Sequence, residues 1–100
     1  MTVQINTDKN IEWDQRHNEH FTGLINGELD RYSEHITRVE VHVSDENAGK
    51  KGVNDIRCLM EVRIEGKQPI AVTEQSNTIE QSVAGSITKV KAALKSILEH

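Results

Sequence analysis

Apolar and polar residues alternate along four stretches of the chain, and this period of two is typical of β-strands with one buried face. The longest stretch begins at Ile56 and alternates through Ile64. Gly66 follows it and permits the positive φ of a tight hairpin, so we expect the next strand to pair back on this one. Pro69 cannot donate to a β-ladder, so that strand starts there or lies at a sheet edge. The predicted strands are residues 2–6, 36–43, 56–65 and 70–73.

Two other segments show the helical period, with apolar residues every three or four positions. The first extends from about Asp14, a suitable N-cap residue, to Tyr32. The second follows Asn77, which with Glu80 three positions later matches a capping box, and its apolar stripe continues to Ile97. The element order is β-α-β-β-β-α. Because strands and helices are apolar on one side only, we predict an α+β two-layer sandwich, a four-stranded sheet with two helices packed on one face.

The length of 100 residues allows one domain with one small core, which we place at residues 1–97. Residues 98–100, Leu-Glu-His, are interpreted as the start of an expression-tag scar. Residues 44–54 show no period and predict a long mobile loop.

No apolar stretch is long enough to span a bilayer, and no basic-then-apolar leader opens the chain, so we expect no membrane partner. The single cysteine, Cys58, excludes an internal disulfide and indicates the reducing cytoplasm.

The charge of −4 and the aromatic content of 3% both argue against a nonspecific nucleic-acid binder or a base-stacking platform. Residues 1–35 hold seven acids and three bases, whereas residues 36–97 hold eight acids and nine bases. The acidity therefore belongs to the first half, and contact with nucleic acid requires a local basic patch in the second.

No residue pattern indicates an enzyme. Cys58 lies on the apolar face of its strand, which favours a buried, inert thiol. His17 and His20 lie one helical turn apart, but no further ligand at usable spacing completes a metal site. The glycines around Lys50 and Lys51 lack the spacing of a phosphate-binding loop. We expect no catalytic residue, no metal, no cofactor and no small-molecule substrate.

One stretch of the second helix is basic: between Glu80 and Glu99 it contains three lysines and no acid. Lysines near a helix C-terminus complement the helix dipole, and the same charges suit contact with phosphate, so both interpretations stay open. The candidate phosphate-binding residues include further bases from the strands and the loop. The full set is Lys89, Lys91, Lys95, Lys50, Lys51, Arg38, Arg57 and Arg63.

The element order resembles that of short ribosome hibernation-promoting factors, a family that includes the ribosome-associated inhibitor and the proteins called sigma 54 modulation factors. The resemblance rests also on the strand at 38–47, the run at 63–73 with its Gly-Lys-Gln-Pro turn, and the helix at 78–91. It implies a bacterial, cytoplasmic protein that is not an enzyme. Such a protein occupies the mRNA/tRNA channel of the small ribosomal subunit by docking to ribosomal RNA phosphates. It thereby inhibits translation and protects idle ribosomes in stationary phase or under stress.

The chain departs from the family at Ala92, where the family places an arginine. Lys89 matches the family by position, whereas Lys91 and Lys95 are only nearby bases. Fewer bases imply fewer phosphate contacts and therefore weaker binding. The alternative hypothesis is a protein-interaction module that keeps the fold, has lost ribosome binding and meets a protein partner through its acidic first helix.

Overall fold

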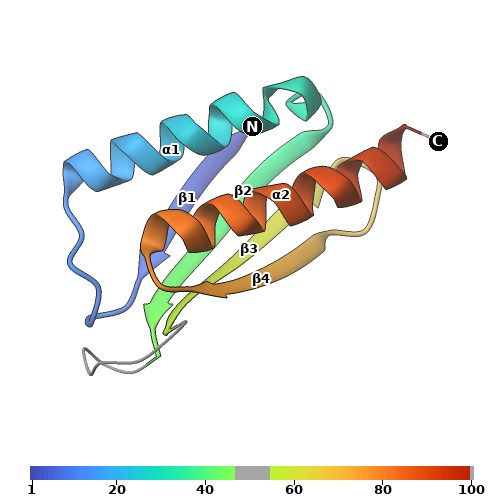
Figure 1. Cartoon of the computed structure of the whole chain (residues 1–100). Helices are drawn as coiled ribbons and strands as arrows, with labels where there is room; N and C mark the ends of the chain where they lie inside the picture. Colours follow the sequence, from blue (N-terminus) through green and yellow to red (C-terminus); the bar gives the residue numbers. More distant parts are fainter. Residues whose placement is uncertain (47–54, 100) are drawn as a thin grey trace.

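Four strands form one sheet, and two helices cover one face of it (Figure 1). The computed structural model describes residues 1–46 and 55–99. The predicted order β-α-β-β-β-α and the α+β two-layer sandwich are confirmed. The elements are β1 (Thr2–Thr7), α1 (Gln15–Leu29), a short 3-10 helix (Asp30–Tyr32), β2 (Ile36–Asp45), β3 (Ile56–Ile64), β4 (Ile70–Ser76) and α2 (Ile79–Leu98).

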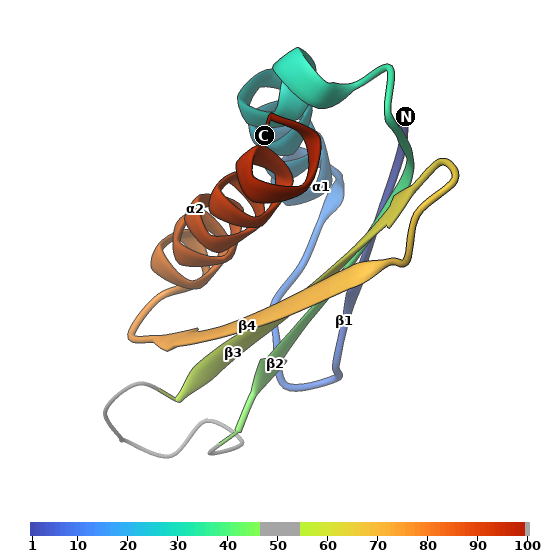
Figure 2. The ribbon, with the colours of Figure 1, turned by 90° about the vertical axis from the view of Figure 1, so that its right-hand side faces the viewer.

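The strands lie in the order β1-β2-β3-β4, which is also their order in the sequence. β1 pairs with β2 in parallel, because α1 carries the chain back across the sheet between them. The pairs β2–β3 and β3–β4 are antiparallel. Figure 2 shows both helices on one side of the sheet and the other side uncovered. The sheet therefore has a helix-covered face and an open face.

The hairpin between β3 and β4 forms as expected, with Gly66 at a φ of 74°. β4 begins directly after Pro69 and lies at the sheet edge, as the proline predicts. β1 continues one residue further than predicted, to Thr7. Two strands are longer than predicted by two residues or more: β2 continues to Asp45 and β4 to Ser76. Their polar ends carry no apolar signal but still pair with β3 through the backbone. The mobile loop was predicted at residues 44–54, but its first two residues belong to β2. Residues 47–54 of that loop lie outside the described residues.

Both helices begin at side-chain caps. Asp14 Oδ1 accepts the N–H of His17 at 2.9 Å, and His17 Nδ1 accepts the N–H of Asp14 at 3.2 Å, which completes a capping box. The capping box predicted at Asn77 is wrong by one residue. Thr78 is the N-cap of α2, because its extended backbone lets its hydroxyl accept the N–H of Gln81 at 3.1 Å.

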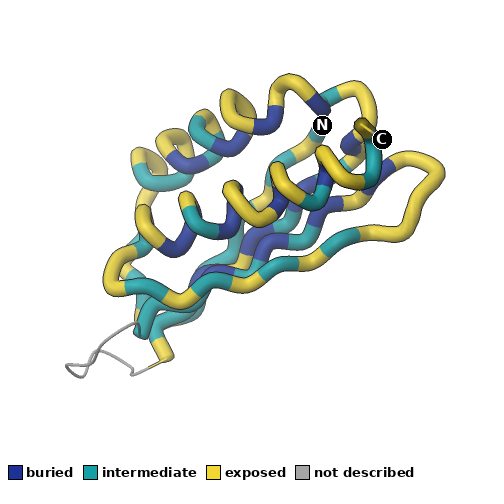
Figure 3. The backbone as a smooth tube through the Cα atoms, turned by 45° about the vertical axis from the view of Figure 1, so that its right-hand side comes forward, coloured by how far each residue is buried: buried dark blue, intermediate teal, exposed yellow. Residues whose placement is uncertain are grey.

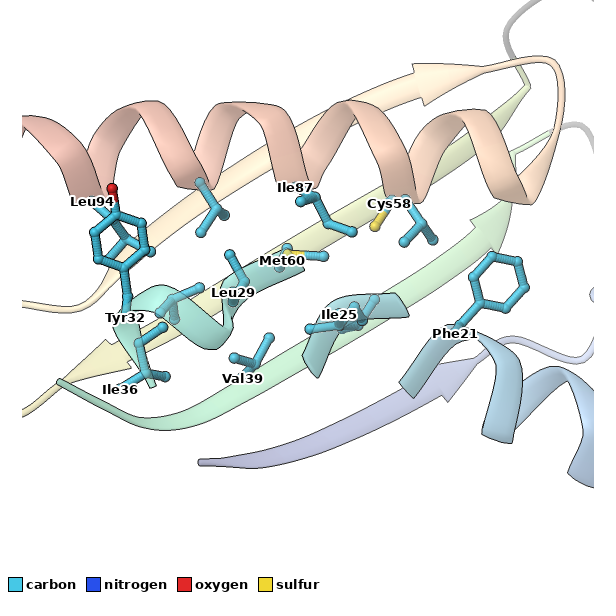
Figure 4. Close-up of a cluster of buried hydrophobic side chains, with 14 of the residues drawn as sticks. Phe21, Ile25, Leu29, Tyr32, Ile36, Val39, Cys58, Met60, Ile87 and Leu94 are labelled. Atoms are coloured by element: carbon cyan, nitrogen blue, oxygen red, sulfur yellow. The ribbon is translucent and has the colours of Figure 1, made fainter. Parts of the chain in front are cut away.

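The core fills the space between the helices and the covered face of the sheet, as the buried positions in Figure 3 and the side chains in Figure 4 show. Cys58 is fully buried there, as its strand position predicts, and burial raises the pKa of its thiol. Each fully buried large apolar side chain stabilises the fold by about 1.5–3 kcal/mol. The most buried of these are Ile25, Leu29, Val39, Val41, Val43, Met60, Val62, Val83, Val90 and Leu94.

Candidate nucleic-acid interface

The lysines of α2 leave the helix on two sides. Lys89 extends over β4, where its Nζ lies 2.7 Å from Glu74 Oε1 and donates to the carbonyl oxygen of Thr73 at 2.6 Å. Lys91 extends toward α1, where its Nζ lies 3.8 Å from Glu28 Oε2. Lys95 is exposed and forms no ion pair with residues 1–46 or 55–99. Two of the three predicted lysines therefore already have a carboxylate partner in this chain.

The ion pairs of Lys89 and Lys91 are weak enough for a phosphate to replace the carboxylate. About half of each lysine side chain is exposed, 51% for Lys89 and 47% for Lys91. Exposed ion pairs of this kind stabilise a protein by about 0–1 kcal/mol. A phosphate can replace Glu74 or Glu28 as the partner at little cost, but the displaced carboxylate then stays nearby and repels it.

The predicted arginines lie on the open face of the sheet. Arg38 and Arg63 are cross-strand neighbours on β2 and β3, and Arg57 pairs in register with Ser44 toward the other end of those strands. Arg38 Nε donates to Glu40 Oε1 at 2.7 Å, and this hydrogen bond lowers the pKa of the Glu40 carboxyl.

The other two arginines also have acidic neighbours. Arg63 Nε lies 3.3 Å from Glu61 Oε1, and Arg57 Nε lies 3.9 Å from Glu46 Oε1. Each arginine of the open face thus has a glutamate beside it, and the face combines both signs of charge.

The eight predicted residues do not form one patch. The lysines of α2 belong to the helical layer and the arginines to β2 and β3, whose open face lies on the other side of the sandwich (Figure 2). Lys50 and Lys51 lie outside the described residues. A single flat partner can contact either the lysines or the arginines, and not both together.

The sequence alone did not identify the two carboxylates that hold the lysines, Glu74 and Glu28. Glu74 shares the helix-covered face of β4 with Ile70 and Val72, so a charge on an otherwise apolar face was a usable signal. Glu28 gave no such signal, because only the packing of α1 beside α2 brings it to Lys91.

Glu99 connects the C-terminal end of α2 to the short 3-10 helix that follows α1. Its carboxylate accepts a hydrogen bond from the hydroxyl of Tyr32 at 2.5 Å and pairs with Arg31. The hydrogen bond to Glu99 raises the pKa of the Tyr32 hydroxyl. Glu99 lies within the stretch interpreted as a tag scar, and in the structure it is the C-cap residue of α2.

The histidines of α1 bind neighbouring side chains. His17 completes the cap of its own helix, and His20 Nε2 lies 3.7 Å from Glu80 Oε1 at the start of α2. Within residues 1–46 and 55–99 no three metal-ligating side chains converge and no pocket is present. In the same ranges no helix is long and apolar enough to cross a membrane.

Comparison with known proteins agrees with this architecture. The N-terminal domain of Protein Y from Thermus thermophilus has a TM-score of 0.77 at 19% identity, over 97% of this chain and 99% of that chain. A ribosomal subunit interface protein from Coxiella burnetii has a TM-score of 0.74 at 14% identity, over 97% of both chains. At these identities the likeness shows a shared fold. Among curated proteins, none matches the chain.

The family is shown by the sequence itself. Residues 4–100, which include all of α1, the sheet beyond the first residues of β1, and α2, match the family model described as sigma 54 modulation protein / S30EA ribosomal protein. The chain therefore belongs to the sigma 54 modulation protein / S30EA ribosomal protein family.

Proposed function

We propose that this protein is a cytoplasmic, ribosome-associated factor without enzymatic activity. It binds the small ribosomal subunit in the mRNA/tRNA channel and silences or protects idle ribosomes under stress. The observation that carries the proposal is membership of the S30EA ribosomal protein family over residues 4–100, the whole folded domain apart from its first residues. The action is steric occupancy, which needs a rigid domain and an electrostatic docking face but no catalytic group.

We place the docking face on α2. Lys95 offers an unpaired charge among the described residues, and Lys89 and Lys91 extend the basic stretch along the helix. Contacts of lysine with phosphate position a protein on RNA without reading its sequence. Because Glu74 and Glu28 compete for two of the lysines, we expect binding that is weaker, with a shallower dependence on salt, than a freely exposed patch provides.

The test is co-sedimentation with ribosomes across a salt series, comparing the native protein with the triple variant Lys89→Gln, Lys91→Gln, Lys95→Gln. All three side chains are exposed, so the fold should persist. We expect lower affinity, weaker inhibition of cell-free translation, and a slope of log affinity against log salt that flattens by about 0.7–0.9 per lost phosphate contact.

The matched control removes three charges from the opposite face: Arg38→Gln, Arg57→Gln and Arg63→Gln. It changes the net charge by the same amount, so a general charge effect weakens both variants equally. We expect this control to keep most of the affinity. Loss of binding in the arginine variant alone would assign docking to the open face of the sheet instead.

A second pair of substitutions works in the opposite direction. Glu28→Gln and Glu74→Gln remove the carboxylates that compete for Lys91 and Lys89. If phosphate takes their place on the ribosome, this double variant should bind more tightly than the native protein. Unchanged affinity would mean that these two lysines do not meet phosphate.

The second candidate is a protein-interaction module without ribosome binding. It is favoured by the exposed carboxylates of Glu19 and Glu28 on α1, and by the pairing of Lys89 and Lys91 within the chain. A native protein that fails to co-sediment with ribosomes at low salt would exclude the ribosome proposal and leave this module, with a basic protein partner at α1.

A further inference from the structure

The two edges of the sheet differ in how they are protected. At the β4 edge, Pro69 directly precedes the strand and the Lys89 ammonium binds the carbonyl oxygen of Thr73. Lysine and proline at an edge discourage pairing with another strand. At the other edge, β1 reads Thr-Val-Gln-Ile-Asn-Thr, with no charge, proline or glycine. Of the strands that the structure describes, β1 is thus the outer one without these protections.

The backbone of β1 has groups that face away from the sheet. Its register with β2 is unbroken from Thr2 to Thr7, and the next residue, Asp8, donates its N–H to the carbonyl oxygen of Val43 in β2 at 3.2 Å. In a parallel strand the N–H and C=O of one residue point to the same side, and successive residues alternate. The even-numbered residues therefore bond to β2, and Val3, Ile5 and Thr7 present their N–H and C=O groups outward.

The apolar side chains of this strand are incompletely covered. Val3 and Ile5 pack against the core but are only partly buried, as is Ile11 shortly after the strand. Their partners on the neighbouring inner strand β2, Val39 and Val41, are fully buried. The sheet thus ends at β1 with both unpaired backbone groups and partly exposed apolar surface.

We propose that this edge pairs with β1 of a second copy of the same chain, antiparallel and across a two-fold axis. With the axis at Ile5, that residue lies opposite its own counterpart and Val3 lies opposite Thr7. All three outward-facing residues then form ladder hydrogen bonds in both copies. The two sheets join into one continuous sheet, with the helices of both copies on the same side.

A second copy fits because the strand complements itself in this register. On the helix-covered side Ile5 meets Ile5, which extends the apolar layer. On the open side Gln4 lies opposite Asn6 of the other copy. Within each copy Gln4 Nε2 donates to Asn6 Oδ1 at 3.3 Å and Gln4 Oε1 accepts from Arg38. The second lone pair of Gln4 Oε1 can then accept the amide N–H of Asn6 across the strands. No two like charges within Thr2–Thr7 face one another, because the strand has none. A two-fold interface needs such a self-complementary surface.

The experiment is sedimentation equilibrium of the native chain over a range of protein concentrations from about 10 µM to about 1 mM, which covers weak association. We expect the mass to rise from monomer toward dimer. The variant Gln4→Lys, Asn6→Lys brings like charges together across the axis and should weaken the dimer about tenfold or more. Thr7→Pro removes an outward N–H while leaving the bonds to β2 in place, and should have the same effect.

The matched control is Thr73→Lys, Gln75→Lys, which adds the same charges on the same face at the opposite edge of the sheet, β4. It should dimerise like the native chain. Far-ultraviolet circular dichroism confirms that each variant is folded. A native chain that stays monomeric at the highest concentration, or a dimer that survives the Gln4 and Asn6 substitutions, overturns the proposal. Neither result affects the ribosome proposal, which rests on the family match and places docking on α2.

Discussion

Gly85 in α2 faces Glu74 so closely that the next larger residue requires a rearrangement. A Cβ at this position would lie 2.6 Å from Cγ of Glu74 and 2.7 Å from its Cδ and Oε2. The other carboxylate oxygen, Oε1, is paired with Lys89. The variant Gly85→Ala therefore forces the Glu74 side chain to rotate away, and Lys89 loses its partner.

Two opposing effects determine how Gly85→Ala changes the free energy of unfolding. Alanine is favoured over glycine in a helix interior by about 1 kcal/mol. Against this, displacing Glu74 costs the exposed ion pair, about 0–1 kcal/mol, and a shift from its rotamer of about 0.5–1.5 kcal/mol. We expect Gly85→Ala either to leave the free energy of unfolding nearly unchanged or to lower it by up to about 1.5 kcal/mol. In a Glu74→Ala background the same substitution should stabilise by about 1 kcal/mol.

Urea unfolding of the native chain, the two single variants and the double variant measures the coupling between the two positions. We expect a coupling free energy of about 0.5–2.5 kcal/mol, the sum of the ion-pair and rotamer costs. Gly23→Ala is the matched control, because it lies in α1 and an added Cβ meets nothing within 4 Å. It should stabilise by about 1 kcal/mol whichever residue occupies position 74. Equal stabilisation by Gly85→Ala in both backgrounds would refute the placement of Glu74 beneath α2.

Three further predictions concern the cap of α2 and the buried thiol. Thr78→Ala removes the hydroxyl that accepts the N–H of Gln81, and it should lower the free energy of unfolding by about 1 kcal/mol, whereas Thr78→Ser keeps the bond and should stay near the native value. Cys58 should resist thiol reagents until the protein unfolds, and rapid labelling of the native protein would contradict its burial. Because burial raises the pKa of the Cys58 thiol, the folded chain keeps a proton that the unfolded chain loses above about pH 8.5. The free energy of unfolding should then fall by up to about 1.4 kcal/mol per pH unit, and parallel curves for the native chain and Cys58→Ala would contradict this.

The local pattern of the sequence was sufficient for the architecture. Alternation over β3 placed Cys58 and Met60 on the buried face, and the stripe of α2 placed Val90 and Leu94 there, because side-chain direction follows the period of each element. Pro69 and Gly66 marked the hairpin for reasons of backbone chemistry that act within a few residues. The cap of α2 was displaced by one residue because Asn77 and Thr78 are both good capping residues, and only the backbone conformation distinguishes them.

The electrostatic surface was decided by the tertiary structure. The sequence showed that Lys89, Lys91 and Lys95 lie in a stretch without acids, but it could not show that Glu74 reaches the first from β4 and Glu28 the second from α1. Hydrophobic period depends on neighbours along the chain, whereas ion pairs and shared surfaces depend on which distant elements pack together, and that is determined only when the two layers meet.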